Sequence, residues 1–148
     1  MVSNLLLCRL IHLSRWISRN RRNQIISRKV LEITAGDLTS TTMLILWLSA
    51  IASAFIDNIP FVATLIPMIK DMGAMGMTNL EPLWWALSLG ACLGGNGTLI
   101  GASANVVVAS MAAIHGEKIS FAKYFMVAFP IMILSIIISS IYLYLFYL

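Results

Sequence analysis

Two stretches of the chain place polar side chains next to residues that interrupt helices. In the first, "SAFIDNIPFVATLIP" (residues 53–67), Asp57 and Asn58 come just before Pro60. Proline lacks an amide hydrogen and disfavours helical backbone in the residue before it, so we expect a helix to break here and to be disturbed again at Pro67. A carboxylate beside an amide side chain could coordinate a cation, and the carboxylate could also carry a proton.

The second stretch, "LGGNGTLIGASANV" (residues 93–106), is rich in glycine and in small polar side chains. Its glycines are Gly94, Gly95, Gly97 and Gly101, and its polar residues are Asn96, Thr98, Ser103 and Asn105. Unwound backbone exposes amides and carbonyls, and glycine allows a ligand to approach them closely. Such a stretch can hold an anion on amides and hydroxyls, or a Na⁺ ion on carbonyls.

Three long apolar segments must position these two stretches. Residues 42–69 contain one charge, Asp57, whereas residues 82–114 and 124–148 contain none. Each segment exceeds the roughly 20 apolar residues that a helix needs to cross a bilayer core. Of the 148 residues, 59% are hydrophobic and 11% are charged, against about a quarter charged in soluble domains. We therefore predict an all-α, multi-pass integral membrane protein surrounded by lipid, with the last segment as a scaffold helix.

Asp57 is the only charged side chain inside the three segments. A charge at that depth costs at least about 2.5–3.5 kcal/mol unless it faces protein, water or a bound cation. A basic partner on a neighbouring helix could account for it, but the segments contain no lysine or arginine. We favour a functional role, in which Na⁺ or H⁺ binds transiently at Asp57 and Asn58. No resident metal or other cofactor is expected, because the cysteines and histidines are isolated.

The glycine-rich stretch is less well accounted for by helix packing, nucleotide binding or catalysis. Gly97 and Gly101 have the spacing of a helix-packing motif, but packing alone does not account for the four polar side chains beside them. A phosphate-binding loop would require a following Gly-Lys-Ser or Gly-Lys-Thr, which is absent. No nucleophile–base pair indicates an enzyme. Two interrupted membrane segments in one chain are instead typical of a secondary transporter's binding site.

The N-terminal residues 1–38 form a basic head with a different composition. Seven of the ten basic residues precede residue 30, and the first acidic residue is Glu32. Basic charge beside apolar segments favours a helix lying at the membrane interface over nucleic-acid binding, and a mitochondrial transit peptide is the alternative. We divide the chain into this head and a membrane domain at residues 42–148.

The motifs "SAFIDNIPFVATLIPMI" and "LGACLGGNGTLIGASANVV", in this order, resemble the ion transporter superfamily of arsenite permeases, Na⁺/H⁺ antiporters and citrate or dicarboxylate carriers. The resemblance implies a fold of two inverted repeats, each with a re-entrant helical hairpin and a later discontinuous helix. This chain would hold part of one inverted repeat of a citrate-transporter-like domain. That part would consist of a re-entrant hairpin in residues 42–69 that turns near Asp57 and Pro60, a discontinuous helix and a final transmembrane helix.

The resemblance also implies a set of binding residues and a function. The binding residues are Ser53, Asp57, Asn58 and Thr64 in the hairpin, and Gly95, Asn96, Thr98, Ser103 and Asn105 in the unwound stretch. The implied function is secondary active transport of an anionic solute or ion by alternating access, coupled to Na⁺ or H⁺, in the plasma membrane or a melanosome-like organelle. Because family members are several times longer, the missing repeat or a homo-oligomer would complete the transporter. The alternative is a truncated or assembly membrane protein that does not transport.

Overall fold

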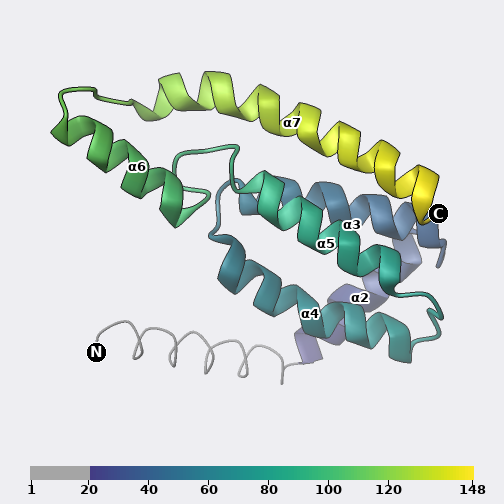
Figure 1. The fold of residues 1–148 in the computed structure, drawn as a ribbon. Helices are drawn as coiled ribbons and strands as arrows, with labels where there is room; N and C mark the ends of the chain where they lie inside the picture. Colours follow the sequence, from purple (N-terminus) through teal and green to yellow (C-terminus); the bar gives the residue numbers. More distant parts are fainter. Residues whose placement is uncertain (1–20) are drawn as a thin grey trace.

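The computed structural model describes residues 21–148, with side chains from residue 27 onward. Residues 1–20, and with them much of the predicted basic head, lie outside the described residues. The described residues form helices and no strand: α2 (Arg21–Ile33), α3 (Leu38–Ser53), α4 (Asn58–Ala74), α5 (Glu81–Gly94), α6 (Ser103–Ile114) and α7 (Phe121–Phe146). The prediction of an all-α chain is confirmed for this part of the sequence (Figure 1).

Helix α5 makes most of the contacts that hold the described helices together. It packs along α3 and also contacts α4 and α7, while α4 in turn contacts α2. Figure 1 shows α7 running alongside α3 and α5, and α6 projecting away from the other helices. No residue of α6 is buried. Within the described part of the chain, α6 is therefore the helix least fixed by packing.

The chain reverses direction between α3 and α4 (Figure 1). Residues 54–57 separate the two helices, so the predicted break is confirmed, and Pro60 lies in the first turn of α4, where a missing amide hydrogen is tolerated. The predicted second disturbance at Pro67 is wrong, because α4 continues through this proline. The buried residues of α4 all follow Pro67, namely Met68, Ile69 and Met72. Their packing stabilises this half of the helix despite the lost hydrogen bond.

The second predicted interruption is also present. Helix α5 ends at Gly94, residues 95–102 are not helical, and α6 begins at Ser103. An apolar segment that composition alone would assign to one continuous span is thus divided into two helices joined by an unwound stretch.

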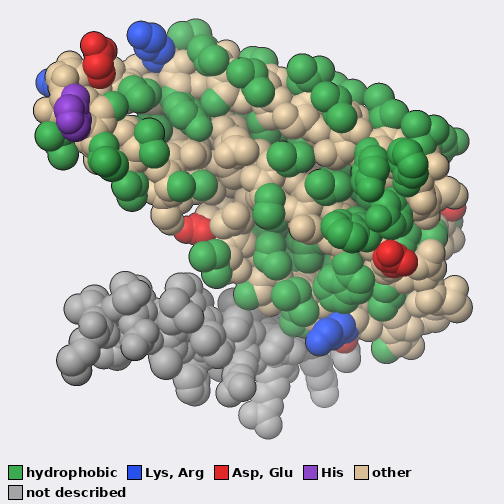
Figure 2. All heavy atoms as spheres, viewed as in Figure 1, with side chains coloured by type: hydrophobic (Ala, Val, Ile, Leu, Met, Phe, Trp, Pro, Cys, Tyr) green, Lys and Arg blue, Asp and Glu red, His purple; other side chains and the backbone are tan. Residues whose placement is uncertain are grey.

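Helix α7 is the one helix among the described residues that is long and apolar enough to cross a membrane. It has 26 residues, and only 22% of its most apolar stretch is buried against the rest of the protein. Helices α3 and α6 are apolar but shorter. Figure 2 shows hydrophobic side chains spread over the visible face, with few charged ones among them. Such a surface suits contact with lipid.

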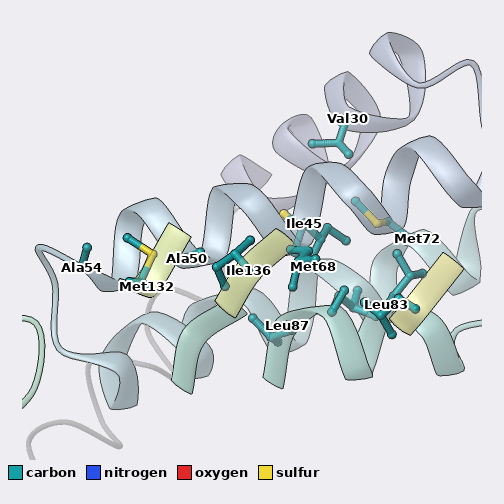
Figure 3. Close-up of a cluster of buried hydrophobic side chains, with 14 residues drawn as sticks. Val30, Ile45, Ala50, Ala54, Met68, Met72, Leu83, Leu87, Met132 and Ile136 are labelled. Carbon is teal, nitrogen blue, oxygen red and sulfur yellow. The ribbon is translucent and has the colours of Figure 1, made fainter. Parts of the chain in front are cut away.

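The core lies where α3, α4, α5 and α7 meet (Figure 3). Its largest buried side chains include Ile45, Leu46, Ile69, Met72, Leu83, Met132, Ile136 and Leu143. The packing of these side chains holds α3 and α5 against each other, and the two interruptions begin where these two helices end.

Two glycines of α5 allow its close approach to α3. A Cβ atom at Gly90 would lie 2.8 Å from the Cβ of Ser49, and one at Gly94 would lie 2.6 Å from the Cα of Ala50. Small residues four positions apart are the usual means of such close packing between membrane helices. The sequence suggested this role for the glycines at positions 97 and 101, but those two lie outside the helices.

Candidate functional site

The two interruptions meet in space and form a junction, which we define as residues 53–58 and 95–105. Two hydrogen bonds join its halves: Ser103 Oγ donates to Asp57 Oδ2 at 2.8 Å, and the Thr98 hydroxyl donates to the Ala54 carbonyl. The fold therefore brings together the two motifs that stand far apart in the sequence.

Thr98 lies at the buried centre of the junction. Its side chain is fully buried, and its Oγ1 accepts a hydrogen bond from the amide of Gly101 at 3.0 Å. A Cβ atom at Gly101 would lie 2.6 Å from the carbonyl oxygen of Gly95 and 2.8 Å from that of Ala54. Only glycine fits at this position, because any side chain would collide with backbone from both halves of the junction.

Other predicted site residues hold the junction together from within. The buried Ser53 hydroxyl donates to the Ala91 carbonyl of α5 at 2.6 Å. The Asn105 side-chain amide donates to the carbonyls of Gly95 and Thr98 at 3.0 and 3.1 Å. Gly95 itself is buried. These residues shape the backbone of the junction, and the Ser53 hydroxyl and the Asn105 side-chain NH2 group are occupied by backbone carbonyls.

The Asp57 carboxylate lies where two helices begin. It caps α4 by accepting a hydrogen bond from the amide of Ile59 at 3.2 Å, and its other partner, Ser103, is the first residue of α6. The amino ends of both helices carry partial positive charge. Hydrogen bonds and helix dipoles therefore stabilise this half-buried carboxylate. The sequence did not reveal this source of stabilisation, because it depends on two helix ends meeting in space.

The three remaining predicted residues differ in how they relate to the junction. Asn58 is half-buried at the start of α4, and the Asn96 side chain is exposed. Neither side chain has a hydrogen-bond partner among the described residues, so both are available to a ligand. Thr64 lies further along α4, where its hydroxyl donates to the Phe61 carbonyl at 2.7 Å. Among the described residues, Thr64 makes no hydrogen bond to the junction.

The unwound stretch also leaves backbone donors free. The amides of Leu99 and Ile100 have no hydrogen-bond partner among the described residues. The amides of Ser103 and Ala104 in the first turn of α6 are likewise without an acceptor in the described part of the chain, as is usual at a helix start. The Asn105 amide, in contrast, donates to the Ala102 carbonyl at 3.1 Å. Free amides at a helix start are suited to binding an anion. The junction thus combines one carboxylate with several amide donors.

Tyr124 is a junction contact that sequence reasoning missed. Its hydroxyl donates to the Asn96 carbonyl at 3.3 Å, which links α7 to the unwound stretch. The sequence indicated only a scaffold role for this segment. The available signal was a tyrosine at the beginning of an apolar span, set apart from the three near its end.

Comparisons with known proteins agree with a role in membrane transport. Residues 24–90 match the model of a family described as Citrate transporter. The chain is 50% identical over 108 residues to the P protein of Sus scrofa, and 52% identical over 103 residues to the P protein of Mus musculus. It is 42% identical over 124 residues to a protein of Mycobacterium tuberculosis described as an uncharacterized transporter. No solved structure is significantly similar to the chain.

The matched regions cover 72%, 68% and 82% of this chain, but only 13%, 12% and 29% of these three relatives. The helical fold and the matches indicate an integral membrane protein that is similar to transporters. Residues 24–90 resemble the citrate transporter family, and the chain resembles the P proteins over most of its length. The resemblance to ion transporters that the motifs indicated is confirmed.

Proposed function

We propose that this chain forms part of a secondary active transporter that moves an anionic solute or ion by alternating access. The family relationship supports membrane transport in general, and the junction supports the more specific proposal. In secondary transporters, interrupted helices present free helix ends to the substrate and the coupling ion. Here the ends of two interrupted segments meet at one carboxylate.

Different groups of the junction would serve the anion and the coupling ion. The free amides of Leu99 and Ile100, together with the Asn96 side chain, are suited to an anionic solute. The Asp57 carboxylate, with Asn58 next to it, is suited to Na⁺ or H⁺. Transport by this route requires no resident cofactor.

The hydrogen bond between Ser103 and Asp57 is the observation that carries the proposal. It links the start of α6 to the start of α4, and α6 has no buried residue of its own. A proton or a Na⁺ ion on Asp57 would compete for the carboxylate oxygen that accepts this hydrogen bond. Ion binding would then release α6 and change the population of two arrangements of the junction, as alternating access requires.

We further propose that α3 and α4 form a re-entrant hairpin and that a missing repeat, or further copies of this chain, completes the transporter. The reversal of the chain between α3 and α4 supports the hairpin (Figure 1). The small share of each relative that the chain matches supports the need for further transporter segments. The exposed apolar side chains of α6 offer a surface for them: Val107, Val108, Met111 and Ile114.

Uptake into proteoliposomes tests the transport proposal. The 148-residue chain is reconstituted alone, and a pig P protein in which this chain replaces the matching segment is reconstituted in parallel. We expect labelled citrate to enter faster under an imposed Na⁺ or pH gradient than without one, in at least one of the two preparations. Uptake equal to that of protein-free liposomes in both preparations would instead favour a membrane protein that does not transport.

A further inference from the structure

A groove of about 510 Å³ runs along the first half of α7. Charged residues line it near the start of α7, namely Glu117, Lys118 and Lys123. Apolar side chains line it elsewhere, namely Leu93, Ile119, Val127, Ala128, Ile131 and Met132. The groove therefore has a charged end, and the rest of its lining is mostly apolar.

The charge at that end is positive. Two lysines and one glutamate leave a net charge of +1. Both lysines are exposed, and neither forms an ion pair within the described part of the chain, where the one ion pair joins Arg28 to Glu32. Their ammonium groups are therefore available to an anionic partner from outside the chain.

The apolar part of the groove runs along α7, in the direction in which this helix would cross the membrane. From Lys123 to Ser135, the last residue of the lining, α7 advances by twelve residues, or about 18 Å at roughly 1.5 Å per residue. Lysines at the end of a membrane-spanning helix lie at the level of the lipid headgroups, where they attract anionic lipids. Val127 and Ile131 are 61% and 59% exposed, so this wall of the groove is open to the bilayer.

We infer that this groove binds one anionic phospholipid, with its phosphate on Lys118 and Lys123 and an acyl chain along Val127 and Ile131. A small soluble anion would bind the two lysines but would leave the apolar part of the groove empty. The same groove is lined by Asn96 and Tyr124, whose hydrogen bond joins α7 to the junction. A bound lipid therefore touches this contact and stabilises the position of the unwound stretch. The inference needs only a membrane setting, and it stands whether or not the proposed transport is correct.

Native mass spectrometry of the purified 148-residue chain in detergent micelles tests the inference. The probe is an equal mixture of phosphatidylglycerol and phosphatidylcholine with matched acyl chains, and the readout is the ratio of the two lipids retained. We expect the wild-type chain to prefer phosphatidylglycerol. In the double variant Lys118→Gln/Lys123→Gln the preference should fall about twenty-fivefold, since each lysine near an anionic lipid contributes roughly a fivefold factor. The matched control Lys29→Gln/Lys70→Gln removes two other exposed lysines and should keep the preference.

Two further measurements distinguish a lipid-binding groove from a site that binds only the phosphate group. Ala128→Trp fills the groove without changing charge, so it should reduce the retention of phosphatidylglycerol while leaving α7 helical by circular dichroism. Glycerol phosphate at the lipid concentration should not displace phosphatidylglycerol. Three results would overturn the inference: equal loss of preference in the control, unchanged retention in Ala128→Trp, or displacement by glycerol phosphate, which would show a site for the phosphate alone.

Discussion

At the scale of single residues, Asp57 combines a capping role with the chemistry of an ion site. Its Oδ1 accepts the hydrogen bond from the Ile59 amide and its Oδ2 accepts the one from Ser103. A cation or a proton that binds Oδ2 would compete with the Ser103 hydroxyl, because both use the lone pairs of that oxygen. The capping bond fixes the side chain at the start of α4, whereas the Ser103 bond is the one that ion binding would break. One residue can therefore both build the junction and sense the coupling ion.

Gly101 offers a test of the junction at the same scale. Gly101→Ala should lower the free energy of unfolding by about 1–3 kcal/mol, because overpacking forces rigid backbone to move, and here the new Cβ would lie 2.6 Å from the Gly95 carbonyl oxygen. Denaturant titration in micelles, followed by tryptophan fluorescence, measures this change. Ala104→Val is the control, because it enlarges an exposed residue of α6 and should change stability by less than about 0.5 kcal/mol. Equal stability of Gly101→Ala and wild type would show that the backbone around this position can move to admit a Cβ atom.

At the scale of helices, the sequence predicted where the chain would break but not how the pieces would pack. The break before Pro60 follows from local backbone chemistry, and the break after Gly94 follows from a run of glycines, so both were visible without a structure. The continuation of α4 through Pro67 was not visible, because it depends on the burial of residues that follow this proline.

The candidate site could be predicted only as two separate groups of residues. Their types indicated ion and anion chemistry, but the roles of individual polar atoms depend on long-range contacts. Ser53, Thr98 and Asn105 use their polar atoms on backbone within or next to the junction, and no local pattern distinguishes such a residue from one that binds ligand. The contact from Tyr124 was missed for the same reason.

The Ser103 bond provides a prediction about α6. Ser103→Ala should raise the rate of amide hydrogen exchange in residues 103–114 roughly fivefold, since a typical hydrogen bond contributes about 1 kcal/mol and α6 has no buried residue to hold it. Exchange of the chain in nanodiscs, measured by mass spectrometry, provides the readout. Ser110→Ala is the matched control, because Ser110 lies on the same helix and bonds only to the Val106 carbonyl. If both variants exchanged at the wild-type rate, the Ser103–Asp57 bond would not restrain α6.

The hairpin proposal makes a prediction about topology. If α3 and α4 enter the membrane and return, single cysteines at Thr39 and Thr78 should react with an impermeant maleimide from the same side of the bilayer. Both substitutions are made in a chain whose native Cys8 and Cys92 are serine, and permeabilised vesicles report total reactivity. Labelling from opposite sides would show that residues 42–69 cross the membrane.

At the scale of the whole molecule, the described helices α3 to α7 are largely apolar, and the two interruptions between them bring Asp57 and the polar groups of the unwound stretch together at one junction. Its described helices expose large hydrophobic side chains along α6 and α7, which suits lipid or further transporter segments. The chain matches 13% of the pig P protein and 29% of the mycobacterial relative. The groove along α7 and the junction touch at Asn96 and Tyr124. Lipid bound in the groove and an ion bound at Asp57 would therefore both act on the junction, through different contacts.

The most direct test of the central claim is gradient-driven uptake by Asp57→Asn, measured in proteoliposomes beside wild type in the preparation that transports. Asparagine keeps the shape and can still cap α4, so the fold should persist, but it removes the charge that a Na⁺ ion or a proton would bind. We predict that the variant loses the acceleration by a Na⁺ or pH gradient that wild type shows. The control Asp71→Asn makes the same change near the end of α4, outside the junction, and should retain the wild-type response. Equal gradient dependence in Asp57→Asn and wild type would contradict the account, because Asp57 would then be a capping residue only and the coupling ion would bind elsewhere.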